Sequence, residues 1–155
     1  MKIAVYGPLC NERSKSTIGV LIKYLKTRNA DVFFEKNFYE SIIIDSDINI
    51  ESFKFETFQS LDTTFELMIS VGGDGTILRA ITYVKDLNIP IVGINTGRLG
   101  FLATIPMNTV ENALDEIFKA NYRISKRSLL TINIDGEETA FDLNFALNEI
   151  SVSRK

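Results

Sequence analysis

The residues with the clearest chemical potential are one aspartate and the glycines around it, in the stretch Gly72, Gly73, Asp74, Gly75 and Thr76. Glycine lets the backbone approach a ligand closely and adopt positive φ angles, and a carboxylate can orient a hydroxyl group or take its proton. The stretch lacks the GxxxxGK[ST] spacing of a Walker A loop, and it contains no lysine that could reach a phosphate. An acid within a glycine turn therefore predicts phosphate binding next to a carboxylate.

The residues on either side of this stretch predict a strand that ends in a tight turn and continues as a helix. Residues 67–71 form an apolar β-type run, and the helical period i, i+3, i+4, i+7 then follows at Ile77, Ala80, Ile81 and Val84. The first turn of a helix presents free N–H groups and the positive end of its dipole, which favours an anion. A second interpretation stays open: Asp74 could simply cap this helix, because aspartate is among the best N-cap residues.

Two further motifs follow in the sequence. Residues 93–102 read GINTGRLGFL, and Asn148 stands next to Glu149. Residues 72–76 resemble the GGDGT signature shared by NAD kinases, diacylglycerol-type lipid kinases and, in a looser form, phosphofructokinases. Residues 93–102 resemble the second motif of NAD kinases specifically, and the pair at 148–149 resembles their third. The chain is thus similar to the first half of an NAD kinase, with three motifs in the expected order.

The resemblance implies an ATP-dependent NAD kinase, which transfers the γ-phosphoryl group of ATP to the 2′-hydroxyl of the adenosine ribose of NAD and forms NADP. Asp74 would orient and deprotonate that hydroxyl, the glycine backbone would bind phosphate, Phe101 would contact the adenine of NAD, and the pair at 148–149 would hold its ribose. A divalent metal, expected to be Mg²⁺, accompanies ATP, and no residue is assigned as a metal ligand. The predicted site residues are Gly72, Gly73, Asp74, Gly75, Thr76, Asn95, Phe101, Asn148 and Glu149.

Other interpretations remain open at this stage. A lipid or sphingoid-base kinase shares the GGDGT stretch, although the motif at residues 93–102 argues against it. The chain could also be a nucleotide-binding module without catalytic activity, in which Asp74 is only a cap. Without the resemblance, Phe101 would be interpreted as a core residue, and Asn148 with Glu149 as a surface pair.

Composition argues against several classes of function. The 155 residues, 45% of them hydrophobic, are enough for one well-buried domain. A formal net charge of −3, without a run of basic residues, argues against nucleic acid and an anionic membrane surface as partners. The absence of histidine and the single cysteine, Cys10, argue against a zinc site and an internal disulfide. No apolar run approaches the ~20 residues that span a bilayer, so we expect a cytoplasmic protein. The resemblance adds the expectation of a homo-oligomer in the complete enzyme.

The elements that must position these residues begin with a βαβ pattern, which predicts an open, parallel, Rossmann-like α/β sheet as in NAD kinases and phosphofructokinases. With a helix after the first of them, strands are expected at residues 2–6, 31–35, 67–71 and 89–95. In such a sheet the carboxyl ends of neighbouring strands share one crevice, so the turns at Asp74 and Gly97 should face the same cavity. Residues 36–66 are too irregular for one element and are interpreted as a partly ordered insertion.

The last third of the chain follows a different pattern. Residues 107–120 predict an amphipathic helix with a capping box formed by Asn108 and Glu111. From about residue 129 the apolar period changes to two, with a turn at residues 135–136, and this change predicts antiparallel hairpins.

These patterns divide the chain into two predicted domains. Residues 1–122 form an α/β nucleotide-binding domain that carries the GGDGT stretch, and residues 123–155 form the first antiparallel strands of an incomplete all-β NAD-binding domain. Because NAD kinases carry further β-structure, we expect little or no kinase activity from this chain by itself.

Overall fold

The computed structural model describes residues 1–44, 48, 55–98, 100–132, 145–147 and 149–151. The chain divides into two compact units, Met1–Tyr122 and Arg123–Lys155. Among the described residues, no helix is both long and apolar enough to cross a lipid bilayer.

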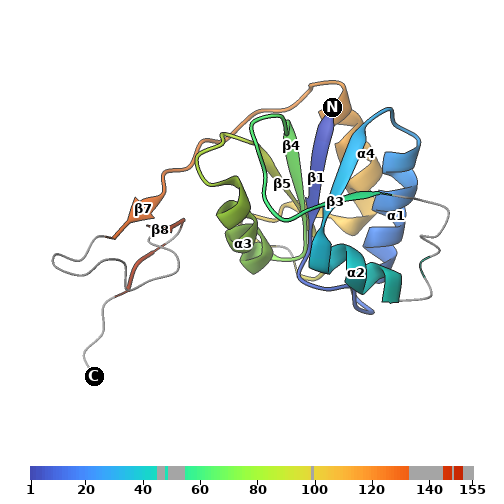
Figure 1. Ribbon diagram of the computed structural model, residues 1–155, viewed down its shortest axis with the longest axis horizontal. Helices are drawn as coiled ribbons and strands as arrows, with labels where there is room; N and C mark the ends of the chain where they lie inside the picture. Colours follow the sequence, from blue (N-terminus) through green and yellow to red (C-terminus); the bar gives the residue numbers. More distant parts are fainter. Residues whose placement is uncertain (45–47, 49–54, 99, 133–144, 148, 152–155) are drawn as a thin grey trace. The chain divides into compact units, whose positions relative to one another are not determined.

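The first unit is built on one sheet whose neighbouring strands are all parallel (Figure 1). Its strand order is β3-β2-β1-β4-β5-β6. The strands are β1 (Lys2–Tyr6), β2 (Asp31–Glu35), β3 (Glu56–Phe58), β4 (Leu67–Val71), β5 (Ile91–Asn95) and β6 (Ile105–Pro106). The helices are α1 (Lys15–Lys26), α2 (Lys36–Ile44), α3 (Asp74–Val84) and α4 (Val110–Phe118), the last preceded by the 3-10 turn η1 (Met107–Thr109). The predicted open, parallel α/β sheet is therefore confirmed.

The helices cover both faces of this sheet, because side chains along each strand alternate between the faces. One face buries an apolar cluster under α1, α2 and α4, and the other face buries a second cluster under α3 (Figure 1). In β1, for example, Ile3 and Val5 belong to the first cluster and Ala4 belongs to the second, and all three are fully buried. Strands that are apolar on both faces are typical of a parallel sheet between helices.

The strand order changes direction between β1 and β4, which are neighbours in the sheet. From β1 the chain passes through α1 to β2 on one side, and from β4 it passes through α3 to β5 on the other. Tyr6 pairs with Ser70 and Val71 with Ile94, so the loops that follow β1, β4 and β5 leave the same edge of the sheet. In open α/β sheets, ligands bind in the crevice at such a point. The predicted shared edge of the two glycine turns is confirmed.

Residues 36–66 are more regular than we predicted. They contain helix α2 and the edge strand β3, which pairs in parallel with β2, and part of the segment lies outside the described residues. Phe38 and Ile42 of α2 and Phe58 of β3 are buried. The sequence did not predict this helix and strand because elements of 9 and 3 residues are too short to show a clear period. The interpretation of the whole segment as a partly ordered insertion stays a prediction.

The helix predicted at residues 107–120 begins later than expected, because η1 takes the place of its first turn. The predicted capping box of Asn108 and Glu111 is not formed. The N-cap of α4 is Thr109, whose side chain makes no capping hydrogen bond and donates instead to the carbonyl oxygen of Pro106 (O···O 3.1 Å). The N-cap is Thr109, one residue after the predicted Asn108, and this shift removes the spacing that a capping box of Asn108 and Glu111 needs.

The described part of the second unit contains one short antiparallel pair, β7 (Leu130–Thr131) and β8 (Phe145–Ala146). The predicted turn at residues 135–136 lies outside the described residues, as does most of the β-like run that we expected up to residue 152. The assignment of residues 123–155 to an all-β NAD-binding domain stays a prediction.

Candidate functional site

Asp74 is the first residue of helix α3, directly after the N-cap Gly73. Its carboxylate accepts three backbone N–H groups from the loop after β5. Phe101 donates to Oδ2 (N···O 2.8 Å), and Leu102 and Ala103 donate to Oδ1 (3.0 and 2.9 Å). The start of α3, which lies within the described residues, has no side-chain capping hydrogen bond. Asp74 therefore does not cap its own helix, and its carboxylate joins the two glycine turns.

These hydrogen bonds determine the charge of the site. The backbone N–H groups of Ala103, Leu102 and Phe101, in this order of effect, lower the pKa of the Asp74 carboxyl below its ordinary value. The carboxylate is therefore ionised throughout the neutral range. An ionised carboxylate of low pKa orients a hydroxyl group well but is a weak acceptor of its proton.

Two glycines of the site are required by close packing. A Cβ at Gly100 would overlap the Asp74 carboxylate, so only glycine lets the loop approach that side chain. A Cβ at Gly72 would overlap the Thr76 side chain, and the φ angle of +156° is one that other residues rarely adopt. The N–H of Gly72 donates to the carbonyl oxygen of Ile94 (N···O 2.9 Å). Gly72 therefore shapes the turn, and its N–H is not available to a phosphate.

The other two glycines of the turn are not required by packing. A Cβ at Gly73 or Gly75 would meet no heavy atom within 4 Å. The first backbone hydrogen bonds of α3 run from the N–H groups of Thr76 and Ile77 to the carbonyl oxygen of Gly73. The N–H groups of residues 73–75 come before this first turn and take no part in these helical hydrogen bonds. Free donors at a helix start, with open space beside them, are the features that bind a phosphate. Gly73 and Gly75 therefore have the features that the predicted phosphate contact needs, and the contact itself stays a prediction.

Asn95, at the end of β5, holds the loop that reaches Asp74. Its Nδ2 donates to the carbonyl oxygens of Arg98 and Ala103 (N···O 2.7 and 3.3 Å), and its Oδ1 accepts the N–H of Gly97 (2.7 Å). The side chain is buried. The amide thus braces the loop from inside, and a contact between Asn95 and a substrate stays a prediction.

Phe101 presents its ring to solvent beside the acid. The residue is 94% exposed, while its N–H is bonded to Asp74. The interpretation of Phe101 as a core residue is therefore wrong. An aromatic ring that is held by its backbone and left open can stack on a flat base. The predicted contact with the adenine of NAD stays a prediction.

The remaining predicted residues differ in their surroundings. Thr76 is buried and packs against the glycine turn. Glu149 is exposed and belongs to the second unit, and Asn148 lies outside the described residues. Sequence reasoning missed the role of Gly100 and of the N–H groups of residues 101–103. The second glycine turn was a signal, but hydrogen bonds between residues 27 to 29 positions apart have no local signature.

Comparisons with known proteins identify the family. A model of the ATP-NAD kinase N-terminal domain matches residues 9–122. The NAD kinases of Christiangramia forsetii and Flavobacterium psychrophilum are 43% and 45% identical to this chain over 157 and 156 residues. Each match covers 100% of this chain and 53% of the relative, so the chain spans about half the length of the curated relatives it matches.

A solved structure shares the fold. The crystal structure of yeast NADH kinase complexed with NADH matches 96% of this chain and 47% of that chain, with a TM-score of 0.66 and 15% sequence identity. The family model spans both glycine turns and most of the first unit. The chain therefore belongs to the ATP-NAD kinase N-terminal domain family.

Proposed function

We propose that this protein is an NAD kinase, which transfers the γ-phosphoryl group of ATP to the 2′-hydroxyl of the adenosine ribose of NAD. The observation that carries the proposal is the ionised Asp74 carboxylate, held at the carboxyl edge of the sheet beside a glycine turn with open N–H groups. The names of the similar proteins, NAD kinase and NADH kinase, support a nicotinamide dinucleotide as the acceptor.

In the proposed reaction, Asp74 accepts a hydrogen bond from the 2′-hydroxyl and so fixes the attacking oxygen. A new O–P bond forms as the bond between the γ-phosphorus and the ADP oxygen breaks, and the hydroxyl proton passes to the carboxylate. The transition state of phosphoryl transfer is loose, so positioning contributes more than the strength of the base. A carboxylate whose pKa is lowered by backbone N–H groups suits this task. The N–H groups of Gly73 and Gly75 would bind a phosphate of the donor.

Magnesium enters this proposal as part of the substrate MgATP. Within the described residues, no group of three or more His, Cys, Asp or Glu side chains could hold a metal ion. Both carboxylate oxygens of Asp74 already accept backbone N–H groups. No step of the proposed mechanism therefore depends on a metal ion held by the protein alone. A cytoplasmic location and a homo-oligomeric complete protein also stay predictions.

The test of the function uses the full-length protein with γ-labelled ATP and either NAD or diacylglycerol as the acceptor. We expect label in NADP and none in the lipid. Label in the lipid would indicate a lipid kinase. Binding of ATP and NAD in a thermal-shift assay, without transfer of label to either acceptor, would indicate a nucleotide-binding module without activity.

A further inference from the structure

The loop after β1, residues 7–14, leaves the same edge of the sheet as the glycine turn, and the loop that carries Phe101 leaves that edge on the other side of β4. In the sheet, β4 lies between β1 and β5, and Tyr6 pairs with Ser70 near the carboxyl ends of their strands. The loop after β5 reaches Asp74 from one side. The loop after β1 therefore starts at the point where the strand order changes direction, next to the turn that follows β4.

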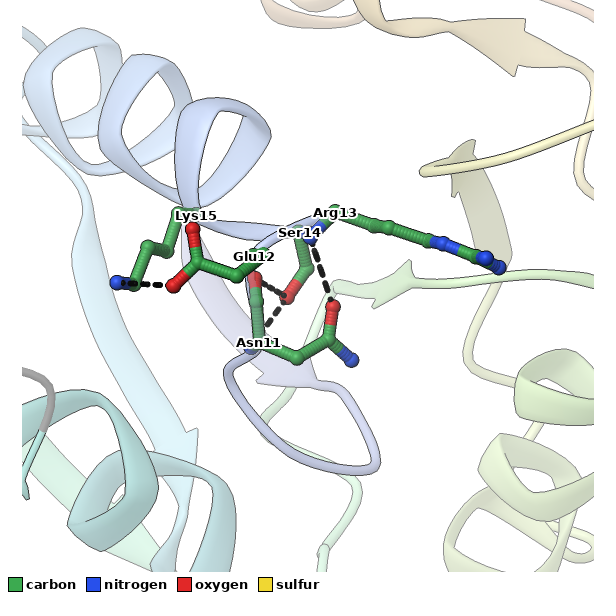
Figure 2. Close-up of polar contacts among 5 residues, drawn as sticks. All are labelled: Asn11, Glu12, Arg13, Ser14 and Lys15. Atoms are coloured by element: carbon green, nitrogen blue, oxygen red, sulfur yellow. Dashed lines mark hydrogen bonds and ion pairs between the residues drawn. The ribbon is translucent and has the colours of Figure 1, made fainter.

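Hydrogen bonds between Asn11 and Ser14 fix the backbone of this loop (Figure 2). The Oδ1 atom of Asn11 accepts the N–H groups of Arg13 and Ser14 (N···O 3.0 and 3.2 Å). The hydroxyl of Ser14 donates to the carbonyl oxygen of Asn11 (O···O 3.1 Å), and its oxygen accepts the N–H of Asn11 (3.0 Å). The base of the Arg13 side chain is therefore held in place directly before helix α1.

The Arg13 side chain points away from these contacts (Figure 2). It is exposed, and no carboxylate in the part of the chain that the structure describes forms an ion pair with its guanidinium group. The neighbouring acid, Glu12, is paired with Lys15 instead (Oε1···Nζ 2.7 Å), as Figure 2 shows. Arg13 therefore offers a planar cation with several donors, which matches the geometry of phosphate oxygens.

The geometry of phosphoryl transfer indicates which substrate lies on this side. The attacking and leaving oxygens stand roughly in line on opposite sides of the phosphorus. The Asp74 carboxylate, which orients the acceptor hydroxyl, is bonded to the loop that carries the open ring of Phe101, so the acceptor belongs to that side. The phosphate chain of the donor then extends toward residues 7–14. A triphosphate carries several negative charges, and the turn at residues 72–76 contains no cationic side chain.

We propose that the crevice between residues 7–14 and residues 72–75 binds the phosphate chain of a nucleoside triphosphate, and that Arg13 holds this chain by a bidentate hydrogen bond. The inference rests on the proposed kinase function. It adds where the phosphate donor binds, on the side of the glycine turn that faces residues 7–14. Removal of a charge-assisted hydrogen bond of this kind weakens donor binding by about 10- to 100-fold.

The test compares variants of the full-length protein: Arg13→Ala, Arg13→Lys and, as a matched control, Lys23→Ala, which removes an exposed cation from helix α1. Initial rates are measured with ATP varied at saturating NAD and with NAD varied at saturating ATP. We expect Arg13→Ala to raise the KM for ATP about 10-fold or more and to leave the KM for NAD within about twofold. The KM for ATP of Arg13→Lys should lie between those of the wild-type protein and Arg13→Ala, because lysine keeps the charge but not the bidentate geometry.

An unchanged KM for ATP in Arg13→Ala would overturn the inference. So would a rise in the KM for NAD as large as the rise in the KM for ATP, or an equally large rise in the KM for ATP in the Lys23→Ala control. A binding measurement separates the inference from the proposed function. If the wild-type protein forms no NADP, the kinase proposal fails, but calorimetric titration with a non-hydrolysable ATP analogue still tests Arg13. Analogue binding should then weaken about 10-fold in Arg13→Ala, whereas equal binding by both proteins would contradict the assigned subsite.

Discussion

At the scale of single residues, the glycines around Asp74 serve two different purposes. Gly72 and Gly100 make room for side chains of the protein itself, whereas Gly73 and Gly75 leave space that the protein does not fill. The sequence identified the acid and the glycine turn, because residue type and spacing are visible there. It could not separate the two kinds of glycine, because the partner of each N–H group depends on contacts across the sheet edge.

The first prediction separates these purposes with two neighbouring substitutions. Gly72→Ala should lower the free energy of unfolding by about 1–3 kcal/mol, because the new methyl group overlaps the buried Thr76 side chain and the backbone φ angle is unfavourable. Gly73→Ala should cause no loss of stability, since its methyl group points into open space. Urea unfolding of both variants measures the difference. Equal destabilisation by the two substitutions would show that the distinction is incorrect.

At the scale of elements, the sequence predicted those strands and helices whose period extends over several residues. The strands at 2–6, 31–35 and 67–71 and the helix after Gly73 were placed correctly. The strands β3 and β6, with 3 and 2 residues, had no period to recognise and exist because a neighbouring strand pairs with them. Sequence pattern alone also could not show that the loop after β5 closes on Asp74.

Helices α1 and α4 are joined by a polar contact that also has a measurable consequence. The hydroxyl of Tyr24 donates to Asp115 Oδ1 (O···O 2.6 Å), and Arg28 forms an ion pair with the same carboxylate. The guanidinium carbon of Arg28 lies 4.8 Å from the centre of the Tyr24 ring. Burial, followed by the hydrogen bond to Asp115, raises the pKa of Tyr24 to about 12.

The second prediction concerns stability at alkaline pH. The pKa of Tyr24 is higher in the folded state, about 12, than its ordinary value of 10, so the neutral phenol stabilises the fold fully below pH 10. This contribution, of the order of 2–3 kcal/mol, is lost as the pH rises from 10 to 12. Urea unfolding at pH 8, 10 and 12 should therefore show that the free energy of unfolding decreases less with pH for Tyr24→Phe than for the wild-type protein. If the free energy of unfolding decreases equally in both proteins, the pKa of Tyr24 is not raised in the folded state.

At the scale of the whole molecule, the first unit carries the acid, the open glycine turn, the exposed aromatic ring and the arginine of the β1 loop. The loops that carry these groups leave one edge of the sheet because β1, β4 and β5 are parallel neighbours, although the loops are far apart in the sequence. The chain spans about half of its relatives, 53% of the two described above. The kinase activity therefore stays a proposal, and the expectation that residues 1–155 alone form little or no NADP stays a prediction.

The measurement that tests the account most directly is the turnover of Asp74→Asn in the full-length protein, with Asp86→Asn as a control for an exposed aspartate outside the crevice. Asparagine keeps the size of the side chain but removes the charge that, in the proposed reaction, orients the hydroxyl, and the oxygen that would take its proton. NADP formation is followed at saturating ATP and NAD, and circular dichroism verifies the fold of both variants. We predict that kcat of Asp74→Asn falls by about 10²- to 10⁴-fold while Asp86→Asn is unaffected. A kcat close to that of the wild-type protein in Asp74→Asn would contradict the central role of this carboxylate.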